Sequence, residues 1–161
     1  MWTIKDPAGD VPSSGGVFLQ IRSPGGKLLA TLRTNVVTAG QCAQKYPYSI
    51  LDSEPLPALA QAGVTPRFTF ESRMNAEATD PKLTSIFEYG ITSTPDPTGP
   101  TACPIVHTFN WPPNQASFSG SYDPFDTTPG NEPNVDTPEI YKGTTEYKNI
   151  RKMITSLHPV G

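Results

Sequence analysis

Residues 17–33 read VFLQIR, then SPGG, then KLLATLR. Both outer runs alternate apolar and polar residues, which is the period of a β-strand. The four residues between them favour a turn, because proline presets φ and glycine tolerates positive φ. The segment therefore predicts an antiparallel β-hairpin. Its apolar residues share one face of each arm: Val17, Leu19 and Ile21 in the first arm, and Leu28, Ala30 and Leu32 in the second.

Further strands are predicted by the same alternation on both sides of this hairpin. We expect them at 67–73, 82–92, 103–111 and 116–122, with a short edge strand around Trp2 and Ile4. The polar stretch between the first two, residues 74–81, reads as a loop. The inward residues of the predicted strands are Phe68 and Phe70 in the first, and Leu83, Phe87, Tyr89 and Ile91 in the second.

Helices have little room in this chain, since 19 of its 161 residues are proline and 13 are glycine. An all-helical fold is excluded. A short helix is expected at 55–62. A longer amphipathic helix is expected at 144–158, where apolar residues recur every three or four positions, namely Tyr147, Ile150, Ile154 and Leu157.

Residues 123–139, DPFDTTPGNEPNVDTPE, have no regular periodicity. A proline-rich chain of this kind loses little entropy when it lies along a neighbouring surface, so we interpret it as an extended acidic arm. The charge pattern agrees: residues 83–141 hold seven acids and no Lys or Arg, whereas residues 142–161 carry +3. Such opposite charges favour complementary surfaces within one molecule or between copies, although an acidic loop can also simply be solvated.

The length suits one domain spanning residues 1–161. Together the elements predict a mainly β fold, an antiparallel β-sandwich or jelly-roll, with a long Pro-rich arm and a short C-terminal amphipathic helix.

The chain has two cysteines and two histidines, which could form a disulfide or bind a metal ion. We favour buried free thiols at Cys42 and Cys103, with a bridge between them as the alternative. Zinc is disfavoured, because Cys103 and His107 would lie about 13 Å apart on one strand. His107 is expected to be partly buried and hydrogen-bonded. The acids of the arm leave a calcium site open, but their spacing matches no EF-hand.

Composition narrows the classes of partner. A net charge of −3 predicts no nucleic-acid binding, and no apolar stretch is long enough for a membrane span. The amino terminus lacks the apolar region of a secretory signal, so no signal peptide is expected. Residues 24–27, Pro-Gly-Gly-Lys, lack the spacing of a phosphate loop. We expect no cofactor.

The leading hypothesis is a non-enzymatic structural protein that assembles with copies of itself. A virion component, such as a phage-like capsid, decoration or tail protein, fits the β-rich, weakly charged composition and the arm, with a virion or extracellular location. The expected binding or interface residues are Trp111, Tyr122, Asp123, Phe125, Asp126, Asp136, Arg151 and Lys152.

Two alternatives belong to other functional classes. A carbohydrate-binding β-sandwich would stack sugar on the aromatic side chains Trp111, Tyr122 and Phe125 beside the acidic loops. An enzyme acting on a small apolar substrate would use Glu71 and Glu88, which are predicted to point into a barrel mouth, as an acid–base pair.

Overall fold

The structure, a computed structural model, describes residues 3–5, 16–37, 40–126 and 135–160. Within these ranges nine strands form one sheet: β1 (Thr3–Lys5), β2 (Phe18–Arg22), β3 (Leu28–Val36), β4 (Tyr46–Pro55), β5 (Arg67–Met74), β6 (Ser85–Thr92), β7 (Thr101–Ala102), β8 (Phe109–Trp111) and β9 (Asn114–Tyr122). The helical elements are a 3-10 turn η1 (Pro57–Leu59), α1 (Pro81–Thr84), α2 (Pro138–Gly143) and α3 (Thr145–Thr155).

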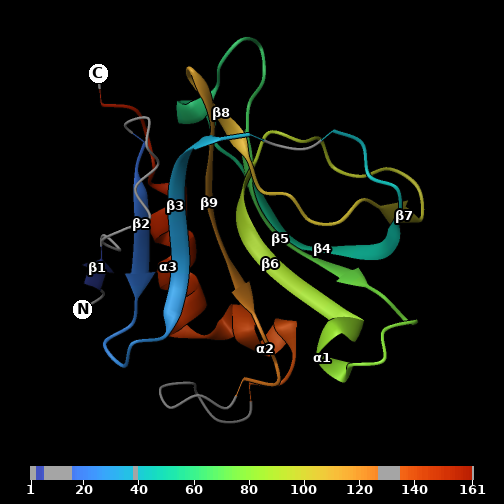
Figure 1. The fold of residues 1–161 in the computed structure, drawn as a ribbon. Coiled ribbons are helices and arrows are strands. Elements are labelled where there is room, and N and C mark those ends of the chain that lie inside the picture. Colours follow the sequence, from blue (N-terminus) through green and yellow to red (C-terminus); the bar gives the residue numbers. More distant parts are fainter. Residues whose placement is uncertain (1–2, 6–15, 38–39, 127–134, 161) are drawn as a thin grey trace.

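The sheet has the strand order β1-β2-β3-β9-β6-β5-β4-β7, with β8 also paired to β9. Its named pairs are antiparallel. The sheet curves, and α2 and α3 pack against one of its faces (Figure 1). The predicted fold class, mainly antiparallel β with a C-terminal helix, is confirmed, and the arrangement is compatible with a β-sandwich. Of the helices described, none is long and apolar enough to span a membrane.

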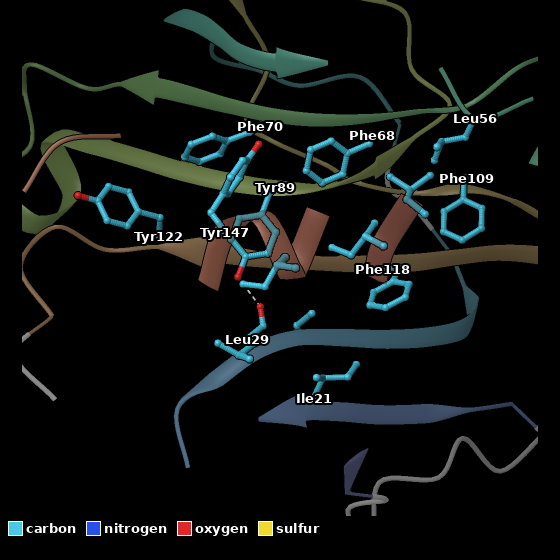
Figure 2. Packing of buried hydrophobic residues seen from close by; sticks show 14 of the residues in the cluster. Ile21, Leu29, Leu56, Phe68, Phe70, Tyr89, Phe109, Phe118, Tyr122 and Tyr147 are labelled. Atoms are coloured by element: carbon cyan, nitrogen blue, oxygen red, sulfur yellow. Dashed lines mark hydrogen bonds between the residues drawn. The ribbon is translucent and has the colours of Figure 1, made fainter. Parts of the chain in front are cut away.

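The hydrophobic core lies between the sheet and α3 (Figure 2). Phe70 of β5 is its centre: it is fully buried, and its ring centroid lies 5.3 Å from Tyr147, 6.1 Å from Tyr141 and 6.2 Å from Tyr89. The Tyr89 hydroxyl donates a hydrogen bond to the carbonyl oxygen of Leu29. Aromatic packing therefore joins the middle strands to both C-terminal helices.

The hairpin at 17–33 is confirmed, with a positive φ of 89° at Gly26. Its second arm differs from the prediction in one respect. At a β-bulge, Ile21 pairs with Ala30 and Arg22 pairs with Leu28, so Leu29 is the extra residue in β3. Leu29 packs into the core and is 1% exposed, whereas Leu28 is 43% exposed. The placement of Leu28 on the core face is therefore wrong.

The predicted C-terminal helix is confirmed as α3, and Tyr147, Ile150 and Ile154 are its buried residues. The Thr144 hydroxyl accepts a hydrogen bond from the Tyr147 amide and caps the helix. The preceding helix α2 was not expected. It begins inside the predicted arm, after the capping residue Thr137. Residues 127–134 of the arm lie outside the described residues.

Three predicted elements are shorter than expected. Residues 81–84 form α1, capped by Asp80, so Leu83 is 54% exposed and its predicted core position is wrong. Of the strand predicted at 103–111, only residues 109–111 form a strand, β8. Residues 103–108 form a loop, in which Pro104 has no backbone N–H to donate to a neighbouring strand. The helix predicted at 55–62 is only the turn η1.

Two further strands are β4, which lies between β5 and β7, and β1, which lies at one edge of the sheet. The sequence reading missed β4, which pairs with β5 along most of its length. The edge strand expected near the start is β1, where Ile4 lies opposite Ile21, whereas Trp2 lies outside the described residues.

Cys42 and Cys103 form a disulfide bond, so the prediction of free thiols is wrong. The cause is the pairing of β4 with β7, in which Tyr46 lies opposite Ala102 and brings the two cysteines together across 61 residues of sequence. The bond closes a long loop that contains β4, β5 and β6.

Candidate functional site

A cavity of about 650 Å³ lies on the sheet face opposite the core. Phe68 and Phe70 of β5 face the helices, so the alternating residues Arg67, Glu71 and Arg73 face the other way and line the cavity. Its other wall is the segment 92–108, which leaves the sheet after β6, passes through β7 and returns at β8. Figure 1 shows β7 at the end of the sheet away from α3.

The wall of the cavity is fastened to β4 and β5 at several points. The disulfide and the pairing of β7 with β4 hold it near Cys103. The Tyr48 hydroxyl lies 3.0 Å from the carbonyl oxygens of both Pro97 and Gly99. The Arg73 Nε donates to the carbonyl oxygen of Cys103 at 2.6 Å. The cavity is therefore preformed rather than a gap beneath a loose loop.

A buried charged cluster lies at the floor of the cavity. The carboxylate of Glu71 accepts hydrogen bonds from Arg73 Nη2 at 2.7 Å and from His107 Nε2 at 3.1 Å. The three side chains are 6%, 9% and 2% exposed, respectively. Burial alone would raise the pKa of Glu71, but the bond from His107 and the charges of His107 and Arg73 hold that pKa below its ordinary value. Glu71 is therefore ionised at neutral pH.

Glu88 lies directly opposite Glu71 in the register of β5 and β6. Burial raises the pKa of Glu88, and the charge of Glu71 raises it further, against the opposing effect of His107 and Arg73. The same cross-strand pair thus holds one carboxyl group whose pKa is lowered and one whose pKa is raised.

Gly90 makes room for His107. A Cβ atom built on Gly90 would lie 2.8 Å from His107 Nδ1 and 2.9 Å from the backbone oxygen of Phe118, so a larger residue would displace the ring. The Nδ1 atom is buried and has no hydrogen-bond partner in the described part of the chain. His107, expected to be partly buried and satisfied, is fully buried and bonded through one ring nitrogen.

The rest of the lining is rich in hydroxyl groups and nearly balanced in charge. Its hydroxyl-bearing residues are Thr92, Ser93, Thr94, Thr98, Thr101 and Thr108. Its charged residues are Lys45, Arg67, Arg73, Glu71 and Asp96, and Arg67 Nη2 pairs with Asp96 at 3.0 Å. The Arg67 Nη1 atom is buried without a hydrogen-bond partner among the described residues.

The aromatic residues predicted to bind sugar are not gathered in one place. Trp111 lies opposite the first residue of β9 and Tyr122 is the last, a span of about 27 Å at strand rise. Trp111 packs edge-on against Phe109, and Tyr122 stacks on Tyr141 at 4.4 Å. Phe125 is 48% exposed.

The charged residues predicted for the interface fall into two groups. Asp123 and Asp126 line a second, small pocket of about 40 Å³ beside Tyr122, while Asp136 is exposed. Arg151 Nε pairs with Asp52 of β4 at 2.8 Å and its Nη1 pairs with Glu54 at 2.6 Å, and Lys152 is exposed. Among the described residues, no group of three or more His, Cys, Asp or Glu is placed to hold a metal ion.

Glu71 and Glu88, singled out from the sequence as a possible pair, are brought together by the structure. Arg73 and His107 were missed as their neighbours. The alternation of β5 carried part of that signal, because Arg73 shares the Glu71 face, but nothing in the sequence placed His107 beside them. No protein-family model, curated protein or solved structure matches this chain.

Proposed function

We propose that the protein binds a small carbohydrate in the cavity between β5 and the segment 92–108. The observation that carries this proposal is the cavity itself, which at about 650 Å³ falls within the size range of small-molecule sites and is fixed in shape by a disulfide. Because the walls of a preformed site are already ordered, little conformational entropy is lost when a ligand binds.

The lining favours a neutral ligand with many hydroxyl groups. Every sugar hydroxyl both donates and accepts, and the cavity offers both functions through threonine hydroxyls and through the ion-paired side chains of Arg67, Arg73 and Glu71. Because most of its charges are paired, the cavity has no strong field for an ion of either sign. Val106 and several prolines in the lining provide apolar contacts for the C–H face of a sugar ring.

A glycan array followed by calorimetric titration tests this proposal. The wild-type protein is expected to bind selectively, and Arg67→Met is expected to weaken binding at least tenfold, since it removes donors from the cavity. Arg22→Met, on the distant strand β2, is the matched control and should bind like the wild type. An array without any selective signal, or equal affinities for Arg67→Met and Arg22→Met, would contradict the proposal.

Self-association is a second proposal, supported by exposed apolar side chains near the acidic arm. Phe125 lies within the arm and Ile140 directly follows it in sequence, and each is 48% exposed. Large apolar side chains exposed in this way are typical of contact surfaces. Sedimentation velocity should show a concentration-dependent oligomer that the double variant Phe125→Ser, Ile140→Ser dissociates. A wild-type protein that stays monomeric at every concentration would refute self-association.

A further inference from the structure

Asp96 is an exposed residue in a restricted stretch of backbone. It lies in the cavity wall between Pro95 and Pro97, and its side chain is 60% exposed. The two proline rings fix φ on both sides of it, and a residue that precedes proline is itself held to extended backbone. The carboxylate of Asp96 is therefore open to solvent, although the chain that carries it has few conformations.

The wall is also anchored close to Asp96 on both sides in sequence. Before it, the Ser93 amide donates a hydrogen bond to the carbonyl oxygen of Thr108 at 2.8 Å. After it, the Tyr48 hydroxyl lies 3.0 Å from the carbonyl oxygen of Pro97. Because both anchors are made by the protein itself, Asp96 is held in place before any ligand binds. Precise recognition of a ligand requires such a fixed side chain.

Arg67 orients the carboxylate from the floor of the cavity. Its Nη2 atom donates to Asp96 Oδ1 at 3.0 Å, and its own side chain is only 13% exposed. An ion pair with one exposed partner contributes little to folding stability, so stability does not explain this arrangement. A carboxylate has about four acceptor positions, and the bond from Arg67 occupies one of them. The others are available to a molecule in the cavity.

From this geometry we infer that Asp96 selects the sugar that binds in the cavity: its carboxylate accepts hydrogen bonds from two adjacent hydroxyl groups of a neutral sugar ring. The inference rests on the proposed function and names the ligand class of the same cavity. A hydrogen bond to a charged group is roughly twice as strong as one between neutral groups, so this contact outweighs those of the threonine hydroxyls. Thr94 and Thr98, which are exposed and also line the cavity, can pair with further hydroxyl groups of the ring.

The same carboxylate disfavours acidic sugars. A uronate group has only acceptor oxygens, so it cannot donate to Asp96, and its charge is repelled. The cations Arg67 and Arg73 are already paired with Asp96 and Glu71. The lining also holds Lys45, which is exposed, so binding of a uronic acid through Lys45 is the outcome that the test has to exclude.

The test titrates the full chain by calorimetry with oligosaccharides of glucose, galactose and mannose, and with the matching oligomers of glucuronic, galacturonic and mannuronic acid. The wild type is expected to bind at least one neutral series at least tenfold more tightly than the matching acidic series. Asp96→Asn should weaken binding of the neutral series at least tenfold and bring the two affinities within a few-fold of each other. Arg67→Met should also weaken binding, but it leaves the charge of Asp96 in place and should keep the preference for the neutral series.

Asp80→Asn is the matched control. It removes the same charge from an exposed residue that does not line the cavity, and asparagine caps a helix as well as aspartate does, so α1 keeps its cap. Both affinities of this variant should equal those of the wild type. Melting by circular dichroism checks that each variant is folded.

The outcomes separate this inference from the proposed function. If Asp96→Asn binds the neutral series like the wild type, the role of Asp96 is overturned and carbohydrate binding stands. Equal or tighter binding of the acidic series by the wild type has the same meaning, and it needs no variant. If the wild type binds neither series, the inference falls, and a glycan array without a selective signal then overturns the proposed function as well.

Discussion

Arg73→Met tests how the charged cluster contributes to stability. The guanidinium group is 9% exposed and bonds Glu71, which is 6% exposed, so its removal leaves a buried carboxylate that keeps the hydrogen bond from His107 but loses its ion pair with Arg73. Breaking a buried ion pair at one partner costs about 3–5 kcal/mol. Methionine keeps most of the apolar stem of Arg73, which confines the change largely to the charge and to the lost bonds to the backbone oxygens of Ser72 and Cys103.

The sign of the pH dependence makes this prediction specific. The pKa of Glu71 in the folded protein lies below its ordinary value of 4.5, so its stabilising contribution is fully present above that value and is lost as the pH falls through the folded pKa. The difference between wild type and Arg73→Met should therefore be largest near neutral pH. It should shrink at the lowest pH at which the wild type remains folded.

Urea denaturation followed by tryptophan fluorescence, with the disulfide intact, measures both quantities. A loss below about 1 kcal/mol at neutral pH would show that the cluster is not the buried ion pair described above. A loss that is equal at both pH values would show that charge is not its origin.

Three further predictions concern the surroundings of the cavity and the core. Gly90→Ala should destabilise the fold by about 1–3 kcal/mol in urea, because the new Cβ would meet His107 and the backbone; unchanged stability would contradict the packing. Replacing Cys42 and Cys103 by serine should cost about 4 kcal/mol and speed amide exchange across residues 92–108, and slow exchange there would count against the anchoring role. Tyr122 should ionise near pH 12 in an absorbance titration, because burial and then the charges of nearby aspartates raise its pKa to about 12. Its contribution to stability is thus present below pH 10 and lost as the pH rises through 12, and ionisation of all six tyrosines near pH 10 would refute this.

The central strands and the acid pair were predictable from local pattern. Phe68, Phe70 and Tyr89 alternate with polar residues, and this alternation places Glu71 and Glu88 on the face away from the core. The helix α3 was equally predictable, since its apolar spacing and the cap at Thr144 both lie within a dozen residues.

The walls of the cavity were not predictable, because they depend on long-range pairing. The strand β4 has prolines at 47 and 55 and reads as broken, yet it pairs with β5 and β7. The disulfide follows from that pairing rather than from the spacing of Cys42 and Cys103. The place of His107 beside Glu71 depends on the course of a loop and on the space left by Gly90.

Chemical-shift mapping of the isotope-labelled protein with its array-selected glycan is the most direct test of carbohydrate binding in the cavity. The largest shifts should fall on the cavity-facing residues of β5 and on the segment 92–108. Shifts centred instead on Trp111 or Phe125, or no shifts at saturating glycan, would contradict the assignment of this cavity as the binding site.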